Sequence, residues 1–159
     1  MSSVITEGIL TIAMVIAASS VAVVFVQNAY QLNYAQSIYL QNTKDISITS
    51  IKIVFAINSS DNEVKVWIKN TGRYVFEQGQ IKQFNIFFGP VTAPVPMFYN
   101  GSFDSWVFEI VNDYDEDGRL DPGETLEITI TLNYTVLEGD YLVMANTHNG
   151  VDDKFFFSV

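Results

Sequence analysis

Acidic side chains between Asp113 and Glu124 stand at the spacing of a twelve-residue calcium-binding loop. Aspartates occupy its first, third, fifth and ninth positions, Gly118 the sixth and Glu124 the twelfth. Ca²⁺ binds about six to eight hard oxygen atoms, and the backbone carbonyl of the seventh residue provides one of them. The spacing therefore predicts a calcium site, structural in role, whose ligands are Asp113, Asp115, Asp117, Arg119, Asp121 and Glu124.

The segments on either side of this loop favour strands, whereas an EF-hand has two helices there. Residues 107–111 and 126–130 are short runs rich in apolar and β-branched side chains. The sequence thus predicts a calcium loop carried by a hairpin. The alternative interpretation is that residues 120–124 form a simple turn that enters a strand, with solvated acidic groups beside it.

Other residues that could do chemistry are few, so we expect no enzyme activity. The chain has no Cys, which excludes thiolate nucleophiles, disulfides and Cys-based zinc sites. Its one histidine, His148, lies in the turn-like stretch Asn-Thr-His-Asn-Gly. No phosphate-binding loop or serine elbow is present. N-glycosylation sequons occur at Asn58, Asn100 and Asn133, consistent with an exterior location.

The charge of the chain is strongly acidic, with 18 Asp and Glu against 8 Lys and Arg and a net charge of −10. Nucleic acids and anionic lipids are bound by clustered basic residues, so neither is expected as a partner. A cation or a basic protein surface fits better. Four aromatic residues in or near loop-like sequence are either protein contacts or side chains that fold back onto the core: Phe76, Phe98, Tyr99 and Phe103.

The first 43 residues contain a single charged side chain, Glu7, and residues 9–26 are almost wholly apolar. Eighteen helical residues span about 27 Å, close to the hydrocarbon thickness of about 30 Å. With Val4 and Ile5 included, residues 4–26 are predicted to cross the membrane once. A cleaved signal peptide is the alternative, but no Lys or Arg precedes Lys44 to form its basic region. The acidic remainder is expected on the outer side, in the extracellular or pseudoperiplasmic space.

The helix is expected to continue beyond the membrane as a stalk, because residues 27–41 contain no Gly or Pro. Tyr30, Tyr34 and the pair Ile38 and Tyr39 recur at helical spacing, which indicates either a spacer or an oligomer seam. Three residues give break signals for the helix: Asn42, Thr43 and Asp45. The predicted organisation is a transmembrane helix with stalk in residues 1–43 and an extracytoplasmic domain in residues 44–159.

From Ile46 onward the pattern changes to the period of two that is typical of strands. Glu63–Lys69 and Leu126–Leu132 alternate apolar and polar residues, and turn residues separate most of the apolar runs. About seven short strands predict a mainly β domain, an immunoglobulin-like antiparallel β-sandwich. Residues 89–96 contain prolines and are expected to form a loop or an edge.

The chain starts Met-Ser-Ser-Val-Ile-Thr-Glu-Gly-Ile-Leu and runs into Thr-Ile-Ala-Met-Val-Ile-Ala-Ala-Ser. A polar stalk and then Val64-Lys-Val-Trp-Ile-Lys-Asn-Thr-Gly72 follow. This layout resembles the accessory FlaG and FlaF proteins of the archaeal flagellum (archaellum), FlaG more closely. The resemblance implies a non-catalytic stator protein with one membrane anchor, which assembles with itself, with a FlaF-like partner, or with both, and reaches the surface-layer protein.

Two other functions fit the same layout. One is a filament subunit of the archaeal type IV pilin or archaellin kind, since such chains share the apolar N-terminal helix and have a Glu near its start. The absence of a basic leader before Glu7 favours the anchored accessory protein. The other is a calcium-stabilised surface adhesin, for which the acidic loop would be the stabilising feature.

Overall fold

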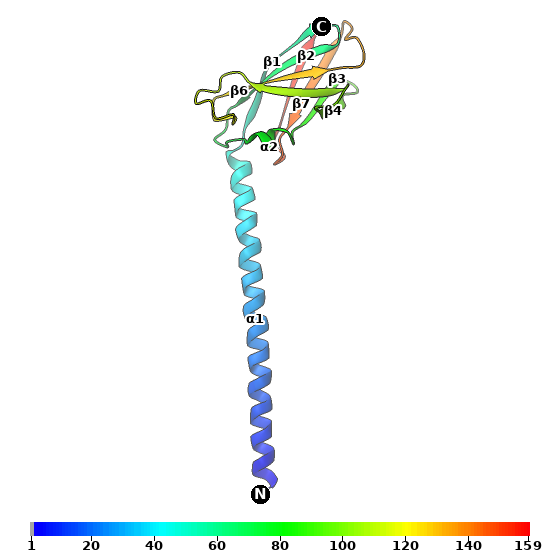
Figure 1. Cartoon of the computed structure of the whole chain (residues 1–159). Helices are drawn as coiled ribbons and strands as arrows, with labels where there is room; N and C mark the ends of the chain where they lie inside the picture. Colours follow the sequence, from blue (N-terminus) through cyan, green and yellow to red (C-terminus); the bar gives the residue numbers. More distant parts are fainter. Residues whose placement is uncertain (1) are drawn as a thin grey trace. The chain divides into compact units, whose positions relative to one another are not determined.

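One long helix precedes a domain built mainly of strands (Figure 1). The computed structural model describes residues 2–159. The chain divides into two compact units, with the division between Thr43 and Lys44. The mainly β fold with an N-terminal helix, expected from the change of period near Ile46, is therefore confirmed.

Helix α1 covers Ser2–Ile48, 47 residues in all, which corresponds to a length of about 70 Å. It is long and apolar enough to cross a bilayer by length and composition. The polar side chains in its apolar part are satisfied within the helix. Thr11, Ser19 and Ser20 each donate a hydroxyl hydrogen bond to the carbonyl four residues earlier, at 2.8, 2.7 and 2.9 Å.

The helix ends later than its sequence indicated. Asn42, Thr43 and Asp45 predict a break, but α1 continues to Ile48, and the strand expected from Ile46 begins at Ile51. The hydroxyl of Thr43 donates to the Tyr39 carbonyl at 2.8 Å, so this residue supports the helix and does not end it.

Contacts with the β domain fix the actual end of α1. The Ile48 carbonyl accepts hydrogen bonds from the N–H groups of Arg73 (2.7 Å) and Tyr74 (3.2 Å). Gly72 allows this approach, because a Cβ there would lie 2.4 Å from the Ser50 nitrogen and 2.5 Å from the Ile48 oxygen. The last carbonyls of a helix need partners outside it, and the turn after the second strand provides them for Ile48.

Eight strands form the domain, and a four-residue helix, α2 (Gln78–Ile81), lies between the second and third strands. The sequence did not predict α2. The strands are β1 Ile51–Ser60, β2 Glu63–Asn70, β3 Asn85–Pro90, β4 Val95–Tyr99, β5 Ser105–Ile110, β6 Thr125–Thr131, β7 Asp140–Asn146 and β8 Asp152–Ser158.

Hydrogen bonds join all eight strands into one sheet in the order β1-β2-β6-β5-β4-β3-β7-β8. Every neighbouring pair is antiparallel except β4 and β5, which are parallel. The sheet is therefore mixed, where the sequence predicted antiparallel pairing throughout. It curls so that its two edge strands, β1 and β8, come into contact, which makes the domain nearly a closed barrel.

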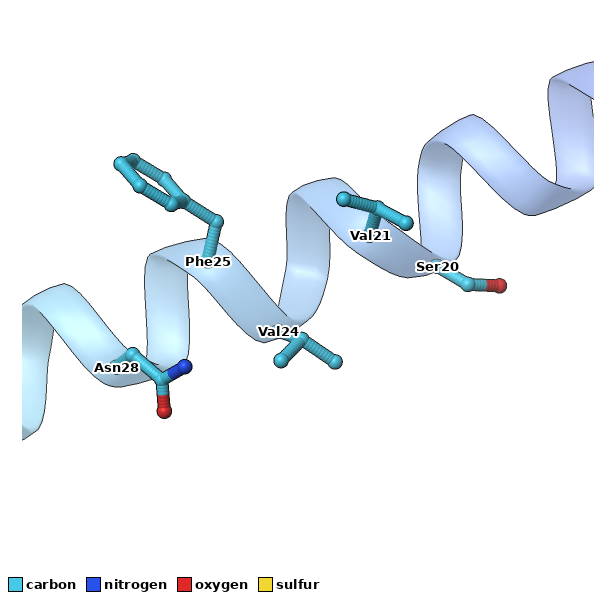
Figure 2. Close-up of a pocket in the computed structure, with 5 residues that line it drawn as sticks. All are labelled: Ser20, Val21, Val24, Phe25 and Asn28. Carbon is cyan, nitrogen blue, oxygen red and sulfur yellow. The ribbon is translucent and has the colours of Figure 1, made fainter.

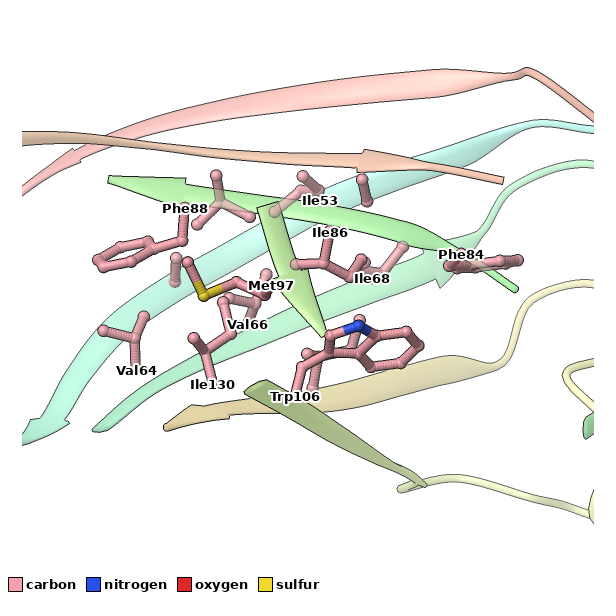
Figure 3. Packing of buried hydrophobic residues seen from close by; sticks show 14 of the residues in the cluster. Ile53, Val64, Val66, Ile68, Phe84, Ile86, Phe88, Met97, Trp106 and Ile130 are labelled. Carbon is pink, nitrogen blue, oxygen red and sulfur yellow. The ribbon is translucent and has the colours of Figure 1, made fainter. Parts of the chain in front are cut away.

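The core lies between the facing parts of this curled sheet. Figure 3 shows side chains from β1 to β6, among them Ile53, Phe88, Met97 and Trp106, directed toward one another. The alternation predicted for β2 and β6 is confirmed, because both residues of every apolar cross-strand pair are fully buried. These pairs are Val64 with Ile130, Val66 with Ile128, and Ile68 with Leu126.

The proline-containing stretch predicted as loop or edge belongs partly to the sheet. Pro90 ends β3, and Pro96 lies in β4 opposite Phe87. On its other side β4 pairs with β5 only at Phe98 and Tyr99. Pro96 thus stands where β4 has a single partner, which a residue without a donor tolerates.

The two edge strands are joined by one side chain of β8. Asp153 accepts a hydrogen bond from the backbone N–H of Ile53 at 2.8 Å through one carboxylate oxygen. Its other oxygen lies 3.0 Å from the Lys52 ammonium nitrogen. Ile53, whose N–H donates to this carboxylate, lies at a register shift in β1 between Ile53 and Phe55.

Candidate functional site

The acidic loop, Asp113–Glu124, connects β5 to β6 and is fixed to the domain at its second half. Leu120 is fully buried and forms an antiparallel bridge with Phe76. The side-chain amide of Asn70, at the end of β2, donates to the Leu120 carbonyl at 3.0 Å. The Asn70 backbone N–H donates to the Glu124 carbonyl at 2.9 Å, so the loop's end is held against β2.

The first half of the loop folds around Asp113. Its two carboxylate oxygens accept hydrogen bonds from the N–H groups of Asp117 (3.2 Å) and Gly118 (2.8 Å). Gly118 has a φ of +71°, and a Cβ there would come within 2.7 Å of the Gln78 side-chain nitrogen. The left-handed φ explains why glycine stands at the sixth position of the loop, whereas the flexible Gln78 side chain can move away from a Cβ.

Three of the predicted ligands converge. One carboxylate oxygen from each of Asp113, Asp115 and Asp117 lies within 4.8 Å of the others. Arg119 competes for this site, because its guanidinium forms an ion pair with Asp117. Hydrogen bonds from the side chain and backbone of Arg119 lower the pKa of Asp117, so that carboxylate is held in its charged form.

Asp121 and Glu124 lie outside this triad and have different surroundings. Glu124 is 2% exposed, and its two oxygens accept hydrogen bonds from the N–H groups of Tyr114 (3.0 Å) and Asp121 (2.8 Å). Asp121 has one buried oxygen without a hydrogen-bond partner in the structure. Burial, and then the charge of Asp117, raise the pKa of Asp121. The structure thus assembles part of the predicted ligand set and uses Glu124 to hold the loop.

His148 packs among aromatic residues. Its ring centroid is 5.6 Å from that of Tyr74 and 6.0 Å from that of Phe76. One ring nitrogen lies 3.5 Å from the Tyr74 hydroxyl, and the other is buried without a partner. Burial lowers the pKa of His148, which favours the neutral imidazole.

An exposed aromatic face covers the outer side of β1 and β2, made by Val54, Phe55, Ile57 and Trp67. Val54, Phe55 and Ile57 are 47%, 51% and 43% exposed, and the rings of Phe55 and Trp67 lie 5.7 Å apart. The register shift between Ile53 and Phe55 lets two consecutive apolar residues, Val54 and Phe55, stay outside. The sequence signal was this Val-Phe pair, which breaks the alternation of β1.

The loop aromatics named from the sequence differ in their exposure. Phe76 is fully buried, so it belongs to the core. Phe98 and Phe103 are 66% and 62% exposed, and Tyr99 is 38% exposed. The Tyr99 ring contacts Trp106 with centroids 5.0 Å apart, so part of this side chain folds back onto the core.

The described part of α1 has shallow hollows between its own side chains. Figure 2 shows one of them, where Ser20, Val21, Val24, Phe25 and Asn28 project from one helix. A hollow between side chains of a single helix has no opposite wall, so we assign no small-molecule site to it.

No protein-family model matches the chain. The chain is 28% identical over 160 residues to an uncharacterised protein of Archaeoglobus fulgidus, and the alignment covers 98% of this chain and 97% of that protein.

Two solved structures share the fold. The archaellum periplasmic stator protein FlaG from Sulfolobus acidocaldarius is similar with a TM-score of 0.59 and 24% identity, over 69% of this chain and 99% of that chain. A chain of the FlaF and FlaG stator protein complex from the same organism gives a TM-score of 0.58 and 24% identity, over 67% of this chain and 87% of that chain. The resemblance to FlaG predicted from the sequence is therefore confirmed at the level of the fold.

Proposed function

We propose that this chain is a membrane-anchored, non-catalytic component of an archaellum stator. The observation that carries the proposal is the fold shared with FlaG, which spans 99% of the FlaG chain. The apolar part of α1 supplies a segment long enough for a single membrane crossing. The acidic β domain then lies outside the membrane, since its charge and size make it a poor occupant of the bilayer.

The proposed partner is a FlaF-like protein, because a FlaF and FlaG complex is among the similar structures. We place the contact on the aromatic face of β1 and β2. Exposed apolar side chains next to one another mark protein contacts, and aromatic residues contribute strongly to such interfaces. Lys69 is exposed on β2, whereas Lys52 on β1 is paired with Asp153, so Lys69 is the residue that can face an acidic group of the partner.

Co-purification from native membranes tests the proposal. Tagged full-length chain is expected to retain a FlaF-like protein, and Phe55→Ser is expected to lose it at least tenfold. Tyr114→Ser is the matched control, since Tyr114 is an 82% exposed aromatic residue on the acidic loop. Failure of the unchanged chain to retain the partner contradicts the stator role. Equal retention by both variants contradicts only the placement on this face.

The N-terminus distinguishes the stator role from a filament subunit. Mass spectrometry of the chain from native membranes is expected to find Met1 intact or only Met1 removed. A mature chain that starts at Ser3 would instead indicate processing of the pilin kind. Binding of the purified chain to surface-layer protein, measured with and without a calcium chelator, separates the adhesin alternative.

We also propose that the acidic loop binds Ca²⁺ in a structural role. The three converging carboxylates of Asp113, Asp115 and Asp117 support this, together with the unpartnered buried oxygen of Asp121. Ca²⁺ binding would require Asp117 to exchange its ion pair with Arg119 for the metal. Bound Ca²⁺ would stabilise the loop, because it would reduce the repulsion between these neighbouring carboxylates.

Calorimetry of the full-length chain in detergent tests the calcium proposal. Ca²⁺ is expected to give a binding heat and to raise the melting temperature, and Asp115→Asn is expected to abolish both. Glu116→Gln, a change of the same charge at an exposed neighbouring position, serves as the control. The absence of heat and of any rise in melting temperature in excess Ca²⁺ would remove the proposal.

A further inference from the structure

The loop between β4 and β5 contains a complete acceptor pattern for N-linked glycosylation. Asn100, Gly101 and Ser102 fit the sequence Asn-X-Ser, with a middle residue other than proline. All three residues are exposed. The carboxamide nitrogen and the Ser102 hydroxyl, which a transferase must reach together, are therefore on the surface.

Backbone hydrogen bonds give this loop a defined turn. The N–H of Phe98 donates to the Asp104 carbonyl at 2.8 Å, and the N–H of Asn100 donates to the Trp106 carbonyl at 3.0 Å. Asn100 has a φ of 53°, in the left-handed region that Asn tolerates better than most residues. The N–H groups of Phe98 and Asn100 are thus bonded to Asp104 and to Trp106 of β5, while the sequon residues stay exposed.

An exposed aromatic ring accompanies the acceptor. Phe98 precedes Asn100 by two residues and is 66% exposed, whereas the intervening Tyr99 packs its ring on Trp106. A Cβ on Gly101 would lie 3.7 Å from the Phe98 Cβ, so the turn passes close to this side chain. The negative face of an aromatic ring attracts the C–H groups of a sugar, so Phe98 offers a surface for the first residue of a glycan.

The other two sequons lack this combination. Asn58 is half-buried, and its carboxamide nitrogen, oriented toward the β1–β2 turn, donates to the Glu63 carbonyl at 3.0 Å. Asn133 is exposed, but the residues before it are Thr131 and the fully buried Leu132. Among these three asparagines, only Asn100 has both an exposed side chain and an exposed aromatic ring two residues before it.

We propose that Asn100 is an N-glycosylation site and that Phe98 packs against the attached sugar. In the transfer, the Asn100 nitrogen forms a bond to the anomeric carbon of a lipid-diphosphate-activated oligosaccharide. The bond from that carbon to the diphosphate oxygen breaks, and the electron pair leaves with the lipid diphosphate. The amide proton passes to the base of the transferase. The proposal rests on the exterior placement of the domain given under the proposed function.

Peptide mass spectrometry of the full-length chain from native membranes tests it. The peptide with Asn100 is expected to have an added glycan mass, and intact chain is expected above the sequence mass of 17.9 kDa. Asn100→Gln and Ser102→Ala are each expected to remove this mass, and the serine variant leaves the turn residue Asn100 in place. Asn58→Gln and Asn133→Gln are expected to leave it unchanged. Phe98→Ala is expected to lower the occupied fraction of Asn100 at least twofold.

Protease treatment of intact cells distinguishes the two ways in which the proposal fails. If the domain is cleaved from outside and Asn100 is unmodified, the glycosylation proposal is wrong while the stator proposal stands. If the domain is protected, its exterior placement fails as well. A glycan found only at Asn58 or Asn133 also overturns the assignment to Asn100.

Discussion

Glu124 shows how one residue can serve a motif and the fold together. Its place at the end of the acidic loop predicted a metal ligand, yet in the structure both of its oxygens accept backbone hydrogen bonds, from Tyr114 and Asp121. A buried carboxylate needs such partners, because an unpaired charge inside a protein is costly. The spacing of the loop was readable from the sequence. The use of Glu124 as an internal acceptor was not, since it depends on how the loop closes on β2.

Replacing Glu124 by Gln is expected to destabilise the domain by about 1.5–3 kcal/mol. The carboxamide nitrogen of Gln would face the N–H of Tyr114 or of Asp121, and its oxygen would accept a weaker hydrogen bond than a carboxylate oxygen does. Chemical unfolding of the full-length chain in detergent measures this change. Glu138→Gln, at an exposed loop position, is expected to stay within about 0.5 kcal/mol. Equal stability of the two variants would contradict the role given to Glu124.

His148 gives the domain a pH dependence whose direction follows from its burial. Burial lowers the pKa of His148 in the folded state below its ordinary value of 6.5, while the charge of Asp45 opposes this. The unfolded chain therefore binds a proton first, and stability falls as the pH decreases through 6.5 toward the lower folded-state pKa. Above that window His148 is neutral in both states and contributes no pH dependence.

His148→Gln is expected to flatten the pH dependence of stability in this window. The difference between the melting temperatures at pH 7.5 and pH 5.5 should be smaller in the variant than in the unchanged chain. Carboxylates titrate mainly below this range, so they contribute little to the comparison. An unchanged slope between the two pH values would show that His148 does not lose its proton on folding.

At the scale of elements, strict alternation is the part of the fold that the sequence predicts best. β2 and β6 each place every second residue in the core, and their register pairs Val66 with Ile128. The elements that were missed depend on distant contacts. The end of α1 is set by the turn at Gly72. The parallel pairing of β4 with β5 requires the loop between them to bring the chain back beside the end of β4.

The two tryptophans have different roles, since Trp106 lies in the core and Trp67 on the aromatic face. Trp106 is 1% exposed, so Trp106→Ala is expected to cost about 3–5 kcal/mol of folding free energy. Trp67 lies on the outer face beside Phe55, and Trp67→Ala is expected to cost about 1 kcal/mol, mainly through the lost ring contact. Denaturant unfolding of both variants provides the comparison. A cost for Trp67 as large as that for Trp106 would mean that this face is structural.

At the scale of the whole molecule, charge and apolar character separate along the chain. Glu7 is the only charged residue before Lys44, and all other charges lie in residues 44–159. This division was visible in the sequence and led directly to the expected anchor and exterior domain. The curling of the sheet was not, because no local pattern states which two strands become edges or that β1 and β8 come together.

Asp153→Ala is expected to free the N–H of Ile53 and to remove the ion pair with Lys52. An open strand edge can recruit a strand from another molecule, so light scattering of the concentrated variant should find larger assemblies. Asp152→Ala, at the exposed neighbouring position, should behave as the unchanged chain does. Identical particle sizes for both variants would contradict this role of Asp153.

In the unchanged chain, the carboxylate of Asp153 on the last strand occupies a backbone donor of the first strand that another strand could otherwise use. With this N–H occupied, β domains at high local concentration are expected not to join edge to edge into a continuous sheet. Contacts with other proteins would then be made by side chains on the outer surface of the sheet, where single substitutions can tune them.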